Sequence, residues 1–288
     1  MERKSTIAKL TGSLLRLVTV SALMLGAAGV SQQAVAGIAN TKHNLGSTGS
    51  GPNVTSGTDE ICVFCHTPHA SDTTAPVPLW NKRLSTGASY QTYANLNSSS
   101  IDGEILAVGS VSMACLSCPD GTQAMDNIIN APGSGLYDAT GGGTNGRAWT
   151  WTSGGEMMSG LAAIAKDTDG LKNDHPVGIQ YCGGGVTTSA ATGANCKDAD
   201  FKGKATGTEN DLKSATINSQ VVWWVETGGN TTREKTDMQL YTRAFTGANG
   251  TGPSVECDSC HDPHTEANPT FLRVSNTGSG VCLSCHVK

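Results

Sequence analysis

Cysteine and histidine recur in this sequence in the order C-x-x-C-H. Two thiols one helical turn apart can add to the two vinyl groups on one edge of a porphyrin, and the histidine that follows can bind the iron axially. Zinc knuckles and redox disulfides also use C-x-x-C, but a histidine after each of three pairs, without an interleaved four-cysteine pattern, favours haem. The sequence therefore predicts three c-type haems. Their residues are Cys62, Cys65 and His66; Cys257, Cys260 and His261; and Cys282, Cys285 and His286.

A fourth pair, Cys115 and Cys118, is followed by Pro119 instead of histidine. Proline offers no ligand, so a haem attached here would lack its proximal bond to iron. Two alternatives follow. Either a fourth haem is attached and its iron is held only by a distant histidine such as His69, or no haem is attached and the cysteines form a disulfide or remain thiols. The surrounding sequence, MACLSC-x-DGT, otherwise resembles a haem site and favours the first alternative.

The sequence contains seven histidines. Three belong to the C-x-x-C-H motifs, and the other four match the number of distal ligands that four attachment sites would need. The count therefore predicts iron held by two histidines, with all seven acting as metal ligands. The four candidates for distal ligands are His43, His69, His175 and His264.

His69 and His264 each follow a motif histidine by three residues, in C-x-x-C-H-x-P-H. Residues three apart on a helical turn share one face, whereas the two axial positions of an iron lie on opposite faces of the porphyrin. Neither histidine can therefore readily bind the iron of its own motif. We expect each to bind the iron of a neighbouring haem, which would hold the haems close together.

His175 and His43 have weaker local evidence. His175 lies in Asn-Asp-His-Pro, where the aspartate could orient the imidazole and the proline stiffens the loop. His43 lies near the predicted start of the mature chain, in a position from which a flexible terminus could reach a haem of another subunit.

Cys182 and Cys196 flank a loop rich in glycine and threonine, and no histidine adjoins them. In an exported protein a disulfide is the expected role of such a pair. Closing a loop of about 15 residues stabilises the folded state by about 3 kcal/mol on the chain-entropy model.

Residues 1–36 have the features of a secretory signal peptide: basic residues, an apolar stretch from Leu17 to Val30, and Ala34-Val35-Ala36 before Gly37. The apolar stretch is too short for a lasting membrane span. The protein is therefore expected to be secreted, to the cell surface or the extracellular space, with the periplasm as an alternative. The net charge of −5 argues against nucleic acid as a partner.

Leu, Ile, Val and Phe make up only about 16% of residues 37–288, below the roughly 20% that usually accompanies a packed core. Covalent porphyrins could supply the missing apolar bulk. The predicted fold class is a multihaem cytochrome c, mostly irregular and loop-rich, with a few short helices at the CxxCH sites, minor β-strand and a core formed largely by haem. Outside the haem sites, the expected elements are an amphipathic helix at 156–166 and a strand at 220–226.

A weak internal duplication suggests the domain organisation, because CVFCHTPH followed by CLSCP is similar to CDSCHDPH followed by CLSCH. We expect a signal peptide at 1–36 and an N-terminal haem-pair unit at 37–130. A Gly/Thr-rich insert with the disulfide and one distal histidine should span 131–254, before a C-terminal haem-pair unit at 255–288.

On these motifs the chain resembles the doubled-CXXCH multihaem c-type cytochromes. It is most similar to the tetrahaem, filament-forming extracellular cytochromes of metal-reducing bacteria. The segments that carry the resemblance are CVFCHTPH, CLSC-x-DGT, NDHPVG, CDSCHDPH with FLR after it, and CLSCH. The resemblance implies closely stacked haems, bis-histidine iron and little regular secondary structure. It also implies a homo-polymer in which one axial histidine crosses the subunit contact, for which His43 is the candidate by position. Pro119 departs from the family pattern.

The predicted function is electron transfer without catalysis, with other cytochromes or extracellular acceptors as redox partners. Iron closed by two histidines passes electrons but binds no substrate. One alternative is a multihaem oxidoreductase with an open haem at the CxxCP site, which would also need groups that handle protons. The other is a structural metal-binding surface protein with zinc in place of haem.

Overall fold

The computed structural model describes residues 37–74, 76–84, 89–96, 98–133, 136–165 and 169–287. The predicted signal peptide lies outside the described residues. From Ile38 onward the chain forms one compact unit, and its division into haem-pair units and an insert stays a prediction. No helix in the described ranges is both long and apolar enough to cross a bilayer.

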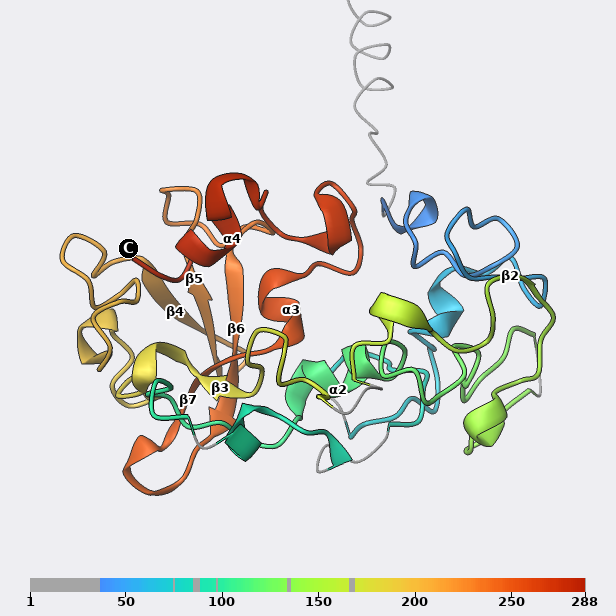
Figure 1. The fold of residues 1–288 in the computed structure, drawn as a ribbon, viewed down its shortest axis with the longest axis horizontal. Helices are drawn as coiled ribbons and strands as arrows, with labels where there is room; N and C mark the ends of the chain where they lie inside the picture. The colour runs from blue at the N-terminus through green and yellow to red at the C-terminus, as the bar shows by residue number, and fades with distance from the viewer. Residues whose placement is uncertain are drawn as a thin grey trace, which may run out of the picture. The chain divides into compact units, whose positions relative to one another are not determined.

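Antiparallel strands dominate the second half of the chain. Figure 1 shows a five-stranded sheet in the order β3-β7-β6-β5-β4. A smaller pair joins β1 to β2 in the first half. The strands are β1 (Val54–Thr55), β2 (Trp151–Ser153), β3 (Ile179–Gln180), β4 (Leu212–Ile217), β5 (Gln220–Val225), β6 (Met238–Ala244) and β7 (Thr251–Val255).

The hairpin of β4 and β5 follows from local sequence. Asn218 and Ser219 both have positive φ, which is the requirement of a two-residue hairpin turn whose twist matches that of its strands. β5 reads QVVWWV, rich in β-branched and aromatic residues that favour extended backbone. The strand expected at 220–226 is confirmed, one residue shorter at its end.

The helices are short. The α-helices are α2 (Ser110–Leu116), α3 (Cys257–Cys260) and α4 (Gly280–Leu283). The single 3-10 turns are η1 (Gly37–Asn40), η2 (Cys62–Phe64), η4 (Tyr93–Leu96), η5 (Gly143–Asn145), η6 (Gly160–Ala162), η7 (Tyr181–Gly183), η8 (Gly193–Asn195), η9 (Gly247–Asn249), η10 (Pro269–Phe271) and η11 (Thr277–Ser279).

The amphipathic helix expected at 156–166 is wrong for the described part of that segment, where only η6 is helical. Gly160 has a positive φ, which interrupts a helix, and Leu161 is fully exposed, although Met158, Ile164 and Ala165 pack against apolar clusters. Isolated helices of this length are marginal in water.

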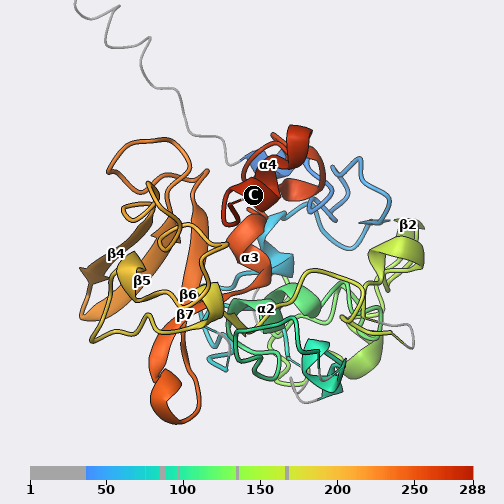
Figure 2. The same cartoon turned by 60° about the vertical axis from the view of Figure 1, so that its left-hand side comes forward.

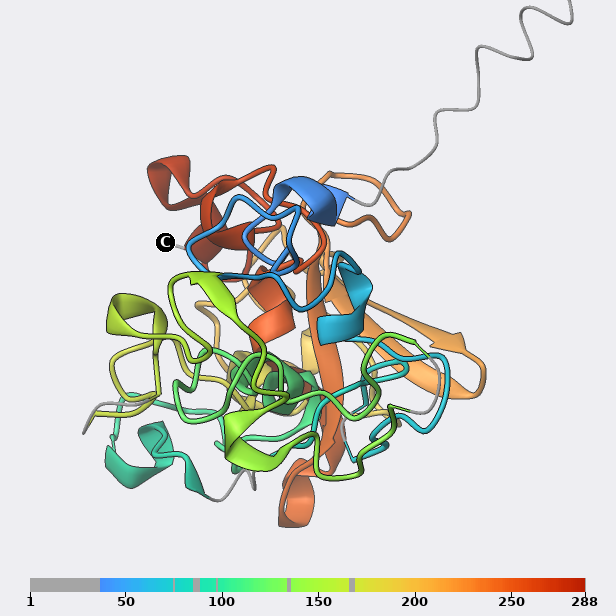
Figure 3. The same ribbon diagram turned by 90° about the vertical axis from the view of Figure 1, so that its right-hand side faces the viewer.

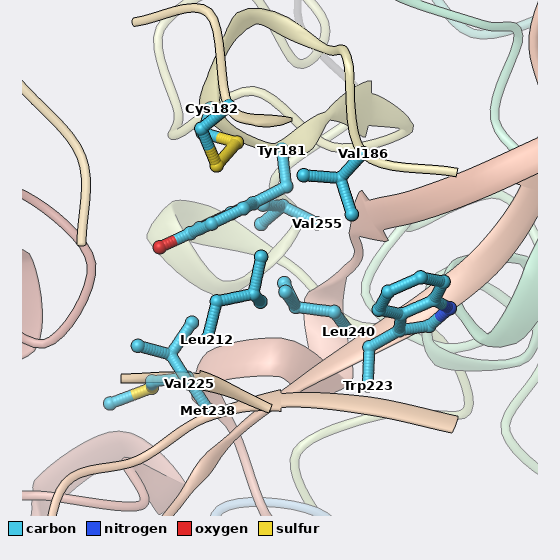
Figure 4. Packing of buried hydrophobic residues seen from close by; sticks show 10 residues of the cluster. Tyr181, Cys182, Val186, Leu212, Trp223, Val225, Met238, Leu240 and Val255 are labelled. Carbon is cyan, nitrogen blue, oxygen red and sulfur yellow. A yellow bond between two sulfur atoms is a disulfide. The ribbon is translucent and has the colours of Figure 1, made fainter. Parts of the chain in front are cut away.

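The largest apolar cluster covers one face of the five-stranded sheet (Figure 4). We call it the sheet core. Its ten buried residues are Tyr181, Cys182, Val186, Cys196, Leu212, Trp223, Val225, Met238, Leu240 and Val255. A disulfide joins Cys182 to Cys196 inside this cluster. The expected disulfide therefore belongs to the packed core of the sheet as well as to the loop that it closes.

The first half of the chain has smaller clusters. One groups Leu45, Val63, Phe64, Met125 and Ile128, and Cys65 and Cys118 pack against it. The last two motifs instead meet the sheet core, against which Cys260 and Cys285 pack. The second cysteine of every C-x-x-C pair thus lies at the edge of an apolar cluster.

Candidate haem sites

The three C-x-x-C-H motifs adopt the same backbone turn. In each, the amide of the histidine donates to the carbonyl of the first cysteine, at 2.8 Å in the first motif, 3.3 Å in the second and 2.8 Å in the third. This bond spans one helical turn, so both thiols and the imidazole emerge from one short helical segment. All six thiols are free. The geometry fits covalent attachment of a porphyrin to the thiols with the imidazole beneath it.

Two of the motif histidines have a defined tautomer. Nδ1 of His66 lies 2.8 Å from the carbonyl oxygen of Pro78, and Nδ1 of His261 lies 2.7 Å from that of Thr270. A carbonyl only accepts hydrogen bonds, so Nδ1 carries the proton and the lone pair of Nε2 remains for a metal. His286 lies beside the ring of Phe201, with the two ring centres 4.2 Å apart.

Three of the four other histidines follow the same rule. Nδ1 of His43 lies 2.9 Å from the carbonyl of Pro263, and Nδ1 of His175 lies 2.9 Å from that of Pro176. Nδ1 of His264 lies 3.1 Å from a carboxylate oxygen of Asp262. Each of these hydrogen bonds orients the imidazole and directs Nε2 outward.

His66 and His264 lie next to each other although they belong to different halves of the sequence. Their ring centres are 6.3 Å apart and their planes are inclined by only 11°. Two imidazoles that share one metal ion, each bound through Nε2 at about 2 Å, have ring centres roughly 6 Å apart. His264 therefore lies beside the histidine of the first motif, at a ring separation similar to that of two imidazoles on one metal ion.

His43 lies against the C-terminal part of its own chain. Its ring stacks on Phe271 with centres 4.0 Å apart, and Lys42 beside it forms an ion pair with Glu266 at 3.1 Å. Figure 3 shows this N-terminal segment, in blue, next to the red C-terminal segment. Burial lowers the pKa of His43, and the neighbouring His264 and His261 lower it further. Within one chain His43 thus lies beside the C-terminal segment, and its role across a subunit contact stays a prediction.

The side chain of His69 is exposed. Its backbone carbonyl accepts a hydrogen bond from Nδ2 of Asn130 at 2.8 Å. The structure brings His264 to another motif but does not bring His69 to one in a comparable way. The equal spacing of the two residues within C-x-x-C-H-x-P-H gave no indication of this difference.

A thiol of the first pair lies near a thiol of the second pair, and a thiol of the second pair lies near a thiol of the third. Burial raises the pKa of Cys65 to about 12, and nearby Cys118 adds to the rise. The thiols of Cys115 and Cys257 form a hydrogen bond, which raises the pKa of Cys115 and lowers that of Cys257. The second pair therefore lies between the first and the third.

The third and fourth pairs are also close. Burial raises the pKa of Cys260 to about 11, with a contribution from Cys282. Burial likewise raises the pKa of Cys285, and Cys260 adds to it. The four pairs thus follow one another in space in the order of the sequence. Haems bound to them would form one chain of neighbours.

Buried polar groups fix the second pair against the third. Oγ of Ser112 donates to Oε2 of Glu256 at 2.6 Å and accepts from the amide of Cys257 at 3.0 Å. Nη1 of Arg243 donates to the other oxygen of Glu256 at 2.7 Å. Burial raises the pKa of Glu256, while Ser112 and Arg243 lower it. Figure 2 shows α2 beside α3, which this network connects.

Among protein-family models, the one for the doubled CXXCH motif matches residues 252–288 of this chain. The matched segment contains the last two motifs, and it indicates covalently bound c-type haem. The match supports a multihaem c-type cytochrome that takes part in electron transfer. No curated protein matches the chain.

The grouping of metal-binding side chains bears on the zinc alternative. Across the described residues, no three or more His, Cys, Asp or Glu side chains converge so that they could hold a metal ion by themselves. Structural zinc is usually held by four such ligands. The second cysteine of each pair lies at the edge of an apolar cluster.

Proposed function

We propose that this protein is an exported electron carrier in which c-type haems form a closely spaced chain, with iron bound by two histidines. The observation that carries the proposal is the pairing of His66 with His264. Two near-parallel imidazoles from distant segments, with ring centres 6.3 Å apart, support a role as two ligands of one metal. Assembly into a filament rests on the resemblance of the motifs alone.

Bound haem would supply reversible one-electron chemistry at its iron. The chain contributes attachment, orientation and closure. Cys62 and Cys65 would anchor the first porphyrin, and the carbonyl of Pro78 holds His66 in the tautomer that exposes Nε2. The carboxylate of Asp262 likewise holds His264 in the tautomer that exposes Nε2. His66 and His264 would together leave the iron no open position, so exchange with water or substrate would be suppressed.

The other motifs follow the same plan. Cys257 with Cys260 and Cys282 with Cys285 would hold two further haems, with His261 and His286 as their first ligands. We assign His43 as the second ligand for the haem of His261, because the two histidines are electrostatic neighbours and Nε2 of His43 is left available by its bond to Pro263. His69 stays a candidate ligand, and we assign it to no particular haem.

The pairing of His66 and His264 can be tested by spectroscopy of the protein produced with c-type haem maturation. His264→Ala should leave the number of covalent haems unchanged, as counted by intact mass. It should add one high-spin component to the absorption and electron paramagnetic resonance spectra of the oxidised protein, because one iron loses a ligand.

The control is the same substitution made in a Cys62→Ser/Cys65→Ser background, where the first haem is absent. There His264→Ala should add no high-spin signal. A new high-spin signal in that background would assign His264 to another iron and overturn the pairing. A wild-type protein without covalent haem would overturn the proposed function itself.

A further inference from the structure

We infer that Cys115 and Cys118 hold a fourth haem whose iron has a protein ligand on one side only, so that the reduced iron binds a small diatomic ligand. The inference rests on the proposed function, since it needs the other haems to be attached. It assigns a ligand-binding position within a chain of otherwise closed haems.

The backbone around this pair is that of an attachment site without its histidine. α2 runs to Leu116, and the amide of Cys118 donates to the carbonyl of Cys115 at 3.4 Å. The amide of Asp120 then donates to Leu116 at 3.1 Å, so the helical turn continues past Pro119. Both thiols are free, although the same structure contains a disulfide elsewhere. The helical turn that the C-x-x-C-H motifs use is therefore retained here.

The position of the pair within the molecule also favours a haem. Cys118 and Cys65 pack against the same apolar cluster, and α2 packs beside α3, so C-x-x-C-H motifs lie on both sides. The Ser112–Glu256 hydrogen bond of 2.6 Å fixes the helix that carries the pair. A haem here would join the first motif to the last two.

Attachment needs no further reactant than the haem. Each thiol S–H adds across one vinyl C=C, which forms one C–S and one C–H bond. Nothing leaves and no electrons are exchanged with another group. The histidine is not part of this bond-forming step, so Pro119 does not prevent it chemically.

One histidine is carried by a segment that packs on α2. Leu171 and Val177 contact the cluster that contains Met113 and Leu116, and His175 lies between them in sequence. Its Nδ1 is bonded to the carbonyl of Pro176 at 2.9 Å, which leaves Nε2 for iron. We assign His175 as the one protein ligand. The opposite position, which a motif histidine would occupy, falls to Pro119 and has no donor.

The side chains next to Cys115 and Cys118 favour binding of a ligand over catalysis of a reaction. Asp120 is almost fully buried, and its carboxylate already accepts from the hydroxyl of Tyr90 at 2.9 Å. The amide and hydroxyl of Thr122 donate to the same carboxylate, both at 2.9 Å. A carboxylate occupied in this way is poorly placed to deliver protons to a substrate.

The test uses the full-length holoprotein and carbon monoxide. Intact mass should count four haems in the wild type and three in Cys115→Ser/Cys118→Ser. The reduced wild type should bind one equivalent of carbon monoxide, seen as a shift of the Soret band, and the double variant should bind none.

Two variants of the proline separate its effects. Pro119→His should keep four haems but lose at least about tenfold in carbon monoxide affinity, because an imidazole then closes the iron. Pro119→Ala, which also removes the proline but adds no ligand, should bind carbon monoxide like the wild type.

Three low-spin haems in the wild type, or four haems without carbon monoxide binding, would overturn the inference and leave the proposed electron carrier standing. Carbon monoxide binding that survives in Cys115→Ser/Cys118→Ser would overturn it too. A wild type without any covalent haem would instead overturn the proposed function.

Discussion

The sheet and the haem motifs are built on different principles. The sheet core has ten buried residues and a disulfide, so it resembles the interior of an ordinary small domain. The cluster beside the first motif has five buried residues, and Cys62 of that motif is exposed. The chain is poor in apolar residues overall, and it has concentrated many of them in the sheet.

This contrast indicates which part of the molecule needs bound haem for its local order. β5 and β6 pair in register from Trp223 with Leu240 to Val225 with Met238, and these residues bury one another. The motif turns instead consist of one helical turn each, which peptide hydrogen bonds alone do not stabilise in water. Haem attachment should therefore decide the order of the motifs and matter little for the sheet.

The largest effect is expected when haem is withheld. The full-length chain produced without c-type maturation should keep slow amide exchange at Trp223 to Val225. The amides of Cys65, His66 and Cys118 should exchange at least about a hundredfold faster than in the holoprotein, since local stability there is lost. Hydrogen exchange measured by NMR checks this. Equal protection of the motif amides in both forms would contradict the contrast.

A smaller effect is expected from the disulfide of the sheet. Cys182→Ser/Cys196→Ser should lower the free energy of unfolding of the sheet by about 3 kcal/mol, because the unfolded chain regains the freedom of the loop. Denaturant unfolding followed by tryptophan fluorescence checks this, with the haem spectrum below the transition unchanged.

A thiol reductant gives the matched control. It breaks the disulfide but leaves thioether bonds to haem intact, so the reduced wild type should be as stable as the double variant. A reductant effect that persists in Cys182→Ser/Cys196→Ser would point to another bond and contradict the assignment.

The smallest effect is expected at Asp126, near the first motif. Burial raises the pKa of this carboxyl, although the amide of Trp149 donates to it at 3.0 Å. Because the folded state holds the proton more tightly, Asp126 contributes stability below pH 4 or so. That contribution is lost as the pH rises through the raised pKa.

Asp126→Asn should therefore remove this fall, so that above about pH 4 the free energy of unfolding rises more steeply with pH than it does in the wild type. Denaturant unfolding at a series of pH values checks this. Asp138→Asn is the control, since that exposed carboxyl has a lowered pKa and its removal should change the slope in the opposite sense. A slope unchanged by Asp126→Asn would contradict the role of burial.

The sequence alone determined the chemistry that depends on neighbouring residues. C-x-x-C-H combines thiols and imidazole within one turn, and the run QVVWWV favours a strand through the shapes of its own side chains. The number of histidines also follows from composition. Local patterns failed at 156–166, where Gly160 takes a positive φ and the apolar residues on its two sides pack against different clusters.

Only the tertiary structure decided which distant residues meet. His264 lies beside His66, His43 on Phe271, and Cys115 against Cys257. These contacts join segments separated by about half of the chain or more, and no local periodicity indicates such a separation. They are fixed by the packing of α2 on α3 and of the N-terminal segment on the C-terminal one, which depends on the shape and burial of many side chains together.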